Sequence, residues 1–467
     1  MTAQTILPAN SVTASFDVAN ALRFEPTATD NLVRDPSSSG NRRTFTISFW
    51  MKFSEVATTT RNIITSNTAG NDYFMIRMED HQLQVLAYNN GTKALAFNTS
   101  ALYRDPSSWH HVVVAVDTTQ GTEGNRFKMY VNGTQITSFA TDDYPSQNVE
   151  VQWNHTENHF IGCFTEGTHV YKGYLCEIVN IDGSQLDVSS FGEFDSDSPT
   201  IWKPKNPAGL TFGTNGFYLN IPGPSTGQNA SGMGGDSSGN GHHFGSSGLA
   251  ADSRVTDTCT NNFSTMNPIY ASGSYTFTEG NLTVDAASAD DISAISTIGF
   301  NQGKWYLEFK IVDQGSRGYL GFTDGADRGL AEGDIRSSPA KWGMYMPAYS
   351  SSSNTSGTIN SNLGTATDND IICFAFDADN GQLFMSKNGN VDISSTAAMT
   401  GITTGNIFHF FTNETASSDA SGYSINFGNP AFSISSGNAD ADGHGNFEYA
   451  VPSGYFALNT KNLAEYG

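Results

Sequence analysis

Short stretches of alternating apolar and polar residues recur along the chain and constrain its fold more than any other feature. The first series comprises Ala21–Phe24, Thr44–Phe53, Phe74–Met78, Leu83–Ala87, His110–Val116, Phe127–Val131, His159–Phe164 and Gly173–Ile181. The second opens near Tyr275 and comprises Lys304–Ile311, Tyr319–Phe322, Trp342–Tyr345, Ile371–Asp377, Gly381–Ser386, Ile407–Phe411 and Ser424–Phe427. Alternation with period two predicts strands. Turn pairs such as Asn90-Gly91 and Asn132-Gly133 predict tight antiparallel hairpins.

Two such series in 467 residues predict an all-β protein of two antiparallel β-sandwich (jelly-roll) domains in tandem. The only helix-like stretch is a possible turn at 186–191. Between the two series the sequence is rich in Gly, Ser and Asn, which predicts a connector. We therefore expect an N-terminal arm at 1–20, a first domain at 21–195, the connector at 196–270 and a second domain at 271–467.

The charge balance excludes several classes of partner. The chain has 46 acidic and 23 basic residues, a net charge of −23, and no basic cluster that could follow a phosphate backbone. We therefore expect no nucleic-acid partner. We also expect no membrane insertion, because no apolar run is long enough to span a bilayer. We also expect no classical secretory signal, because residues 1–8 have neither a basic region nor a long apolar core.

The four cysteines show no metal-binding spacing and are expected to be buried free thiols. A disulfide between Cys163 and Cys176 is the alternative.

The first domain carries motifs in the order found in laminin G-like, concanavalin A-like domains, and we identify it as resembling that family. The motifs are Leu22-Arg-Phe24, Phe45-Thr-Ile-Ser-Phe-Trp50, Trp109-His-His-Val-Val113, Tyr130-Val-Asn-Gly133, Phe160-Ile-Gly162 and Gly173-Tyr-Leu-Cys-Glu-Ile178. The resemblance covers residues 15–195. It implies a jelly roll that binds a glycan, and it implies calcium as a possible cofactor. The candidate ligands for calcium are the acidic turn residues Asp30, Asp72 and Asp117.

The second domain resembles the SPRY sandwich, a fold that mostly binds peptides or proteins. The resemblance rests on Gly303-Lys-Trp-Tyr-Leu-Glu-Phe309, Gly318-Tyr-Leu-Gly-Phe322, Asp370–Asp377, Asn380–Gly389 and Ile425-Asn-Phe-Gly428. It implies a protein-binding loop at 347–358.

Two further segments, 174–203 and 452–463, resemble parts of tail and fibre proteins of phages. This similarity implies a virion protein made in the host cytoplasm and extracellular after lysis.

Catalytic motifs are lacking, so we expect the protein not to be an enzyme. No strand carries a pair of carboxylates suited to glycoside hydrolysis, and Glu177, Asp182 and Glu308 are isolated acids expected to be solvated or structural. Neighbouring residues on a strand point to opposite faces, so His110 and His111 cannot share one ligand.

Aromatic side chains near strand ends are the candidate sugar-binding residues, since a flat ring can cover the apolar face of a pyranose. They are Tyr73, Tyr103, Tyr144, Trp153 and Tyr171 in the first domain, and Tyr345 and Tyr349 in the second.

The sequence thus predicts a non-enzymatic phage virion protein, in a fibre, tail or head appendage, that attaches to host-surface glycans or proteins. Its expected partners are that receptor, other virion proteins and further copies of itself, with a trimer favoured. The first alternative is a capsid decoration or scaffold protein without receptor binding. The second is an enzyme that degrades polysaccharide.

Overall fold

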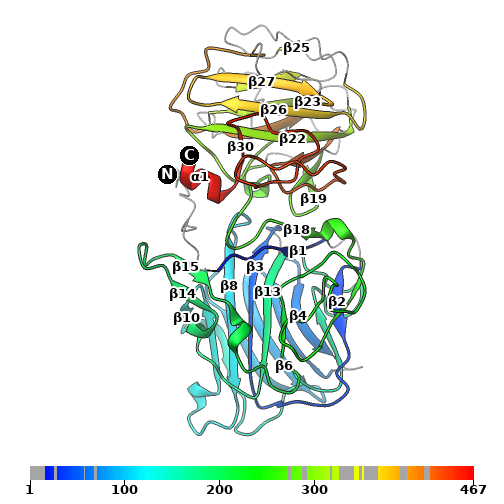
Figure 1. Ribbon diagram of the computed structural model, residues 1–467. Coiled ribbons are helices and arrows are strands. Elements are labelled where there is room, and N and C mark those ends of the chain that lie inside the picture. Colours follow the sequence, from blue (N-terminus) through cyan, green and yellow to red (C-terminus); the bar gives the residue numbers. More distant parts are fainter. Residues whose placement is uncertain are drawn as a thin grey trace. The chain divides into compact units, whose positions relative to one another are not determined.

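The computed structural model describes residues 16–25, 29–56, 58–67, 71–271, 275–286, 292–315, 318–324, 341–345, 350–351, 366–389, 397–414 and 421–467. Nearly all of its regular structure is β-strand, which confirms the predicted fold class. The chain divides after Thr260 into two compact units, whose strands can be followed by colour in Figure 1. We call residues 13–260 the N-terminal unit and residues 261–467 the C-terminal unit.

The N-terminal unit is built from two antiparallel sheets. Sheet I has the order β10-β9-β8-β3-β13-β1-β18, with β16 paired to β13. Its strands are β1 (Ala21–Phe24), β3 (Thr44–Phe53), β8 (Trp109–Asp117), β9 (Phe127–Val131), β10 (Thr134–Gln135), β13 (Gly173–Asp182), β16 (Phe217–Leu219) and β18 (Arg254–Val255).

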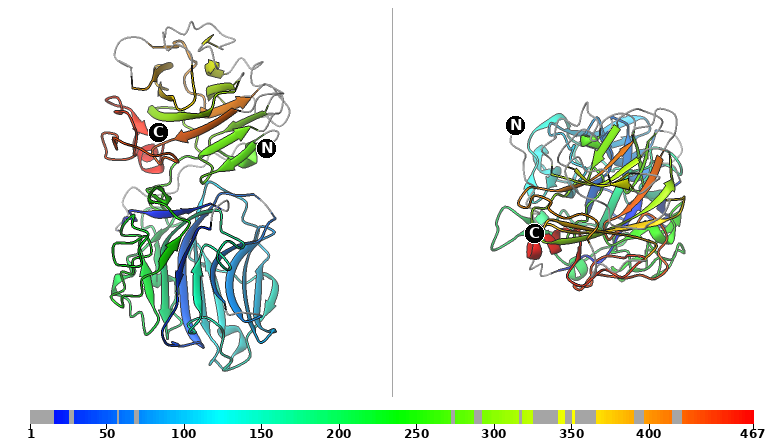
Figure 2. Two further views of the ribbon diagram at one scale, coloured as in Figure 1. Left: turned by 90° about the vertical axis from the view of Figure 1, so that its right-hand side faces the viewer. Right: turned by 90° about the horizontal axis from the view of Figure 1, so that it is seen from above.

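Sheet II has the order β11-β7-β6-β5-β4-β12-β2-β17. Its strands are β2 (Asn31–Arg34), β4 (Arg61–Asn67), β5 (Tyr73–Glu79), β6 (Gln82–Asn89), β7 (Thr92–Thr99), β11 (Phe139–Asp143), β12 (Asn158–Ile161) and β17 (Gly245–Ser247). Figure 2 shows the strands of this unit from two further directions.

The core of the N-terminal unit lies between the inner faces of these sheets. Alternate residues of β3, such as Phe45 and Ile47, belong to one buried cluster with Phe74, Ile76 and Val85 of sheet II. The hairpin pair Asn132-Gly133 has φ values of 47° and 77°, as a tight turn between β9 and β10 requires.

The outer face of sheet I is also buried, because residues 183–260 fold over it. Phe191, Phe212 and Tyr218 form a second buried cluster with Val113 and Val179 of sheet I. This segment includes the hairpin β14 (Gly192–Phe194) and β15 (Trp202–Pro204), and the 3₁₀ turns η2 (Val188–Ser190), η3 (Pro207–Gly209) and η4 (Ala251–Ser253). Strand β3 is therefore buried on both faces.

This arrangement differs from the predicted connector at 196–270. Strands β16, β17 and β18 pair with β13, β2 and β1, so residues 196–260 are an integral part of the N-terminal unit. A high content of glycine and serine predicts local turns. It does not predict whether a segment pairs with strands that are distant in the sequence.

Residues 254–260, which we call the strap, are fixed to sheet I by a buried ion pair. Lys52 Nζ lies 2.9 Å from Asp257 Oδ2, and the two side chains are 1% and 0% exposed. Trp109 Nε1 donates to Asp257 Oδ1 at 3.1 Å. Cys176 Sγ contacts Cys259 Sγ at 3.9 Å, and all four cysteines are buried and free, as predicted. The thiol in contact with Cys176 is therefore that of Cys259 and not that of Cys163, and the two are not joined by a disulfide.

The C-terminal unit also contains two antiparallel sheets. One has the order β19-β20-β29-β22-β26-β27, with β30 paired parallel to β22. Its strands are β19 (Tyr275–Thr278), β20 (Thr283–Ala286), β22 (Lys304–Asp313), β26 (Ile371–Asp377), β27 (Gln382–Lys387), β29 (Ser421–Asn426) and β30 (Phe456–Ala457). The other has the order β21-β28-β23-β24-β25, made of β21 (Ile292–Ile295), β23 (Gly318–Thr323), β24 (Lys341–Tyr345), β25 (Ser350–Ser351) and β28 (His409–Glu414).

Helix is scarce, as predicted. The remaining helical elements are η1 (Glu123–Asn125), η5 (Pro268–Tyr270) and α1 (Thr460–Tyr466), and α1 was not predicted from the sequence. Asn459 caps α1 by accepting a hydrogen bond from the backbone N–H of Asn462. Within the described residues, no helix has the length and apolar character needed to cross a membrane.

Candidate ligand-binding face

The outer face of sheet II presents three parallel rows of side chains, which follow directly from the strand register. On β5, Phe74, Ile76 and Met78 point into the core, so the intervening residues point outward. Each outward residue of β5 is paired with residues on the neighbouring strands. Together, these paired residues form a row that crosses the sheet.

The middle row is mostly apolar. It runs through Val33, Phe160, Thr65, Met75, Leu86 and Ala96. Only Val33 and Leu86 of this row are partly exposed and the other four residues are buried, so a small part of the row can contact the C–H groups of a ligand.

One flanking row is aromatic at its centre, and we call it the aromatic row. It consists of Asn158, Asn67, Tyr73, Tyr88 and Lys93. The rings of Tyr73 and Tyr88 are both partly exposed, with their centroids 5.0 Å apart. Phe164 meets the Tyr73 ring edge-on at 5.8 Å. Burial raises the pKa of the Tyr73 hydroxyl, so this group stays protonated and can donate a hydrogen bond.

The other flanking row is polar. It consists of Asn62, Arg77, Gln84, Asn98 and Thr141. Arg77 Nε donates to Gln84 Oε1 at 3.0 Å, and Arg77 Nη2 donates to Glu79 Oε2 at 2.5 Å. These contacts tie the Arg77 guanidinium to Gln84 and Glu79.

Several buried oxygens on this face have no hydrogen-bond partner among the described residues. They are Asn62 Oδ1, Thr65 Oγ1, Asn67 Oδ1 and Asn98 Oδ1. Asn62 and Thr65 are only 1% and 0% exposed. Asn67 and Asn98 are partly exposed, so their unpaired oxygens beside the partly exposed rings indicate a ligand that donates hydrogen bonds, because buried polar atoms in native proteins are nearly always paired.

Tyr73 is the one predicted sugar-binding residue that the structure places on this face. Tyr88, Phe164 and the four unpaired acceptors were missed. Tyr88 could have been found, because it directly follows the predicted strand Leu83–Ala87 in the same alternating pattern. The four acceptors could not have been found from the sequence, because only the pairing register of the strands brings them together on one face.

Two of the predicted sugar-binding residues are wrong because their rings are fully buried. Trp153 and Tyr171 are each 0% exposed. Trp153 Nε1 donates to Asn180 Oδ1 at 2.9 Å, and the Tyr171 hydroxyl donates to the Lys52 carbonyl at 3.1 Å. Both rings are part of the core, where a sugar cannot reach them.

The remaining candidates lie away from this face or outside the description. Tyr103 packs against His110, and Tyr144 packs edge-on against Phe97. Tyr345 lies in β24, but its side chain is outside the described residues, as are Tyr349 and most of the predicted loop at 347–358.

The three predicted calcium ligands do not form one site. Asp30 accepts from the Glu25 N–H, Asp72 from the Asn90 N–H, and Asp117 from the hydroxyls of Thr44 and Thr119. In the described part of the chain, no group of three or more His, Cys, Asp or Glu side chains could hold a metal ion. The described residues therefore do not fit the expected calcium site.

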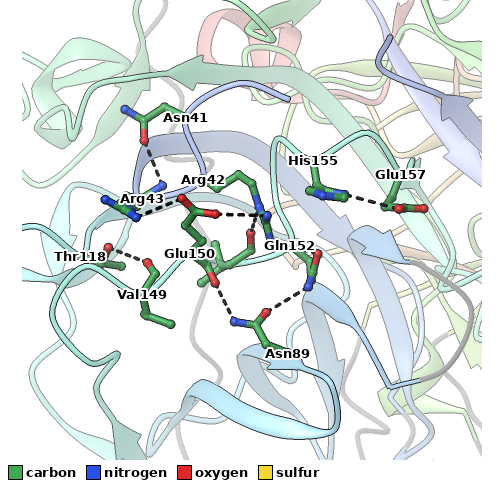
Figure 3. Close-up of polar contacts among 11 residues, drawn as sticks. Asn41, Arg42, Arg43, Asn89, Thr118, Val149, Glu150, Gln152, His155 and Glu157 are labelled. Atoms are coloured by element: carbon green, nitrogen blue, oxygen red, sulfur yellow. Dashed lines mark hydrogen bonds and ion pairs between the residues drawn. The ribbon is translucent and has the colours of Figure 1, made fainter. Parts of the chain in front are cut away.

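A polar cluster joins loops of the N-terminal unit, and Figure 3 shows its contacts. Glu150 pairs with Arg42 at 3.3 Å and with Arg43 at 3.1 Å. Gln152 accepts from Arg42 and donates to Asn89, whose side chain donates in turn to the Glu150 carbonyl. Because these groups bind one another, the cluster fits a structural role.

The outer face of sheet I contains Ser48, His111 and Glu177 in a small cavity under the segment 191–207. Trp202 Nε1 donates to His111 Nδ1 at 2.9 Å, so the imidazole proton lies on Nε2, which contacts Ser48 Oγ at 2.8 Å. Burial also lowers the pKa of His111 to about 3. The imidazole therefore donates to Ser48 and cannot take its proton, which excludes nucleophilic catalysis by this pair.

The acids singled out in the sequence are structural. Glu177 accepts from the Tyr218 hydroxyl at 2.7 Å. Asp182 accepts from the backbone N–H groups of Asn41 and Asn215, each at 2.7 Å. Glu308 accepts from the backbone N–H groups at 448 and 449. All three are buried, so none of them is solvated.

Comparison with known proteins agrees with the resemblance of the first domain. Residues 27–181 match the laminin G family model described as the concanavalin A-like lectin/glucanases superfamily. No curated protein matches the chain in sequence. Residues 27–181 of the N-terminal unit thus have a lectin-like fold.

Several solved structures are similar to parts of the chain. The SPRY domain of human HERC1 has 17% identity and a TM-score of 0.29, over 34% of this chain and 96% of that one. A heptameric SAP-like pentraxin from Limulus polyphemus has 16% identity and a TM-score of 0.27, over 37% and 80%. A putative carbohydrate-binding protein from Bacteroides ovatus has 15% identity and a TM-score of 0.24, over 36% and 44%.

Proposed function

We propose that this protein is a non-enzymatic glycan-binding protein whose binding site is the outer face of sheet II. The observation that carries the proposal is the combination of partly exposed Tyr73 and Tyr88 with buried, unpaired acceptor oxygens on one face. A pyranose ring can stack on the tyrosines while its hydroxyls donate to the amide oxygens. The lectin-like match of residues 27–181 supports this role.

The carboxylates beside this face support binding without catalysis. Glu79 is held by Arg77 and by the Thr60 hydroxyl, and Asp143 is ion-paired with Lys93. Glycoside hydrolysis needs two carboxyl groups on either side of the scissile bond, one of them protonated. Two carboxylates that are each neutralised by a cation do not suit that mechanism.

We place this binding activity on a phage virion, in a fibre, tail or head appendage that attaches to host-surface glycans. The support is the resemblance of segments 174–203 and 452–463 to phage tail and fibre proteins. In this proposal the C-terminal unit contacts other virion proteins. Several copies of the chain, as in a trimer, would raise the avidity of a weak single site by orders of magnitude.

The test of glycan binding is a glycan array probed with the purified full chain and with the variants Tyr73→Ala and Tyr88→Ala. We expect saturable binding that each variant weakens at least tenfold, or about 1.4 kcal/mol. Tyr270→Ala is the matched control, since Tyr270 is a 55% exposed aromatic residue of the C-terminal unit. Equal binding by all four proteins would overturn the assignment of this face.

A further inference from the structure

We infer that the outer face of sheet II selects uncharged, hydroxyl-rich glycans over carboxylated or sulfated ones. This inference rests on the proposed function and names the ligand class of the same face. Three independent features support it: the pairing of the cations, the chemistry of the unpaired atoms, and the net charge of the chain.

The cations in the rows of this face are already neutralised. Arg77 in the polar row is bound to Glu79, at an Nη2–Oε2 distance of 2.5 Å. Lys93 in the aromatic row pairs with Asp143 of the adjacent strand β11. An anionic sugar would have to compete with a carboxylate of the same sheet, which lowers the net attraction that these cations offer it.

The unpaired atoms are oxygens that accept hydrogen bonds. Those on the partly exposed side chains of Asn67 and Asn98 are amide oxygens, which can only accept. Sugar hydroxyls can donate to these oxygens, whereas a carboxylate or sulfate group cannot, so each anionic group that stands in place of a hydroxyl removes a donor. An unpaired buried polar group is costly, so this mismatch disfavours anionic ligands.

The net charge of the whole chain also disfavours anionic glycans. A net charge of −23 repels a polyanion at long range and slows its association, most strongly at low ionic strength. A neutral polysaccharide does not experience this repulsion. Binding of the preferred ligand should therefore depend little on salt.

The experiment compares a neutral with an anionic polysaccharide on the same backbone: dextran with dextran sulfate, and hydroxyethyl cellulose with carboxymethyl cellulose. The probes are the full chain and three variants, Glu79→Gln, Asp143→Asn and Asn98→Ala. Binding is measured by affinity electrophoresis and calorimetry at low and at moderate salt.

We expect the unmodified chain to bind a neutral member at least tenfold more tightly than its charged counterpart. Glu79→Gln and Asp143→Asn release Arg77 and Lys93, so each variant should narrow that ratio several-fold at low salt. Asn98→Ala removes an acceptor and should weaken binding of the neutral ligand several-fold. Asp143 is 49% exposed, so Asp143→Asn keeps the test valid if Glu79→Gln does not fold.

Two results would overturn the inference, and they differ in whether the proposed glycan binding survives. Equal or tighter binding of the charged members, weakened by Tyr73→Ala, would refute the selection for neutral glycans and leave the binding face in place. Absence of saturable binding to every member, with the protein folded, would refute glycan binding and the inference together.

Discussion

Glu177 and Tyr218 form a buried pair on the outer face of sheet I, at an Oε2–Oη distance of 2.7 Å. Burial raises the pKa of Glu177 from its usual 4.5 to about 7. The folded state therefore binds this proton more tightly than the unfolded chain does. The resulting stabilisation is complete below pH 4.5 and is lost as the pH rises to about 7.

The substitution Glu177→Gln tests this titration. A shift of that size is equivalent to ~3 kcal/mol, which the native protein loses between pH 4.5 and about 7 and the glutamine variant keeps. The variant should be the more stable protein at pH 8, with a flatter pH dependence, in urea unfolding at pH 5 and pH 8. Glu150→Gln, on a side chain that is 47% exposed, is the control. Identical pH dependences for Glu177→Gln and the native protein would contradict the assignment.

Trp153 is a core residue, and its substitution should affect stability. Trp153→Ala leaves a cavity and an unpaired Asn180 oxygen, so we expect ~3–5 kcal/mol of destabilisation. Tyr88→Ala, at a partly exposed ring, should cost less than about 1 kcal/mol and reduce glycan binding instead. Chemical denaturation and binding measured on both variants separate the two roles. A stable Trp153→Ala protein would show that the ring is not packed as described.

The sequence could not distinguish these aromatic residues from one another. Trp153 and Tyr73 both lie among polar residues near the ends of predicted strands. Only the pairing of β4, β5 and β6 determines that Tyr73 faces outward, and only the packing of Trp153 against Phe74 and His159 buries it. Exposure of a ring depends on contacts that are distant in sequence.

At the level of elements, strands with one clear apolar face were predictable and short or polar ones were not. Strands β1 and β3 match the predicted stretches Ala21–Phe24 and Thr44–Phe53. Strand β4 was missed because its outer face carries polar residues of the binding face, whereas β12 was predicted to begin one residue late and to end three residues late. Strands β16, β17 and β18 have two or three residues each, too few to show a period.

The strap at 254–260 is held by a buried ion pair, so removal of one partner should be costly. Lys52→Met leaves the buried Asp257 carboxylate without its lysine cation, and we expect ~3–5 kcal/mol of destabilisation in urea unfolding. Adding Asp257→Leu should recover part of this loss, because the double variant buries no charge. Lys93→Met, which breaks an exposed pair, should cost less than about 1 kcal/mol. A mild effect of Lys52→Met alone would show that the strap is not anchored there.

For the whole molecule, the two-sandwich architecture was predictable but the boundary between the units was not. The sequence assigned 196–260 to a connector, whereas the structure uses it to cover sheet I and to extend both sheets of the N-terminal unit. The reason is physical: a Gly-rich segment can pair and pack as part of a sandwich when its few aromatic residues, such as Phe212 and Tyr218, find a hydrophobic surface.

This boundary leads to a prediction about truncated chains. A fragment of residues 16–260 should unfold cooperatively, because it retains both sheets and the segment that covers sheet I. A fragment ending at residue 195 exposes Val113 and Val179, leaves the charge of Lys52 unpaired, and should aggregate or bind a hydrophobic dye. Circular dichroism and thermal unfolding of both fragments provide the comparison. A stable fragment of residues 16–195 would contradict the structural role of 196–260.

The central claim is that the outer face of sheet II binds a glycan, and the most direct test is a crystal structure of the full chain with a neutral oligosaccharide. We predict sugar rings stacked on Tyr73 and Tyr88, with hydroxyls within hydrogen-bonding distance of Asn67 or Asn98. A sugar bound instead at the Arg42 and Glu150 cluster, or on the C-terminal unit, would contradict the account.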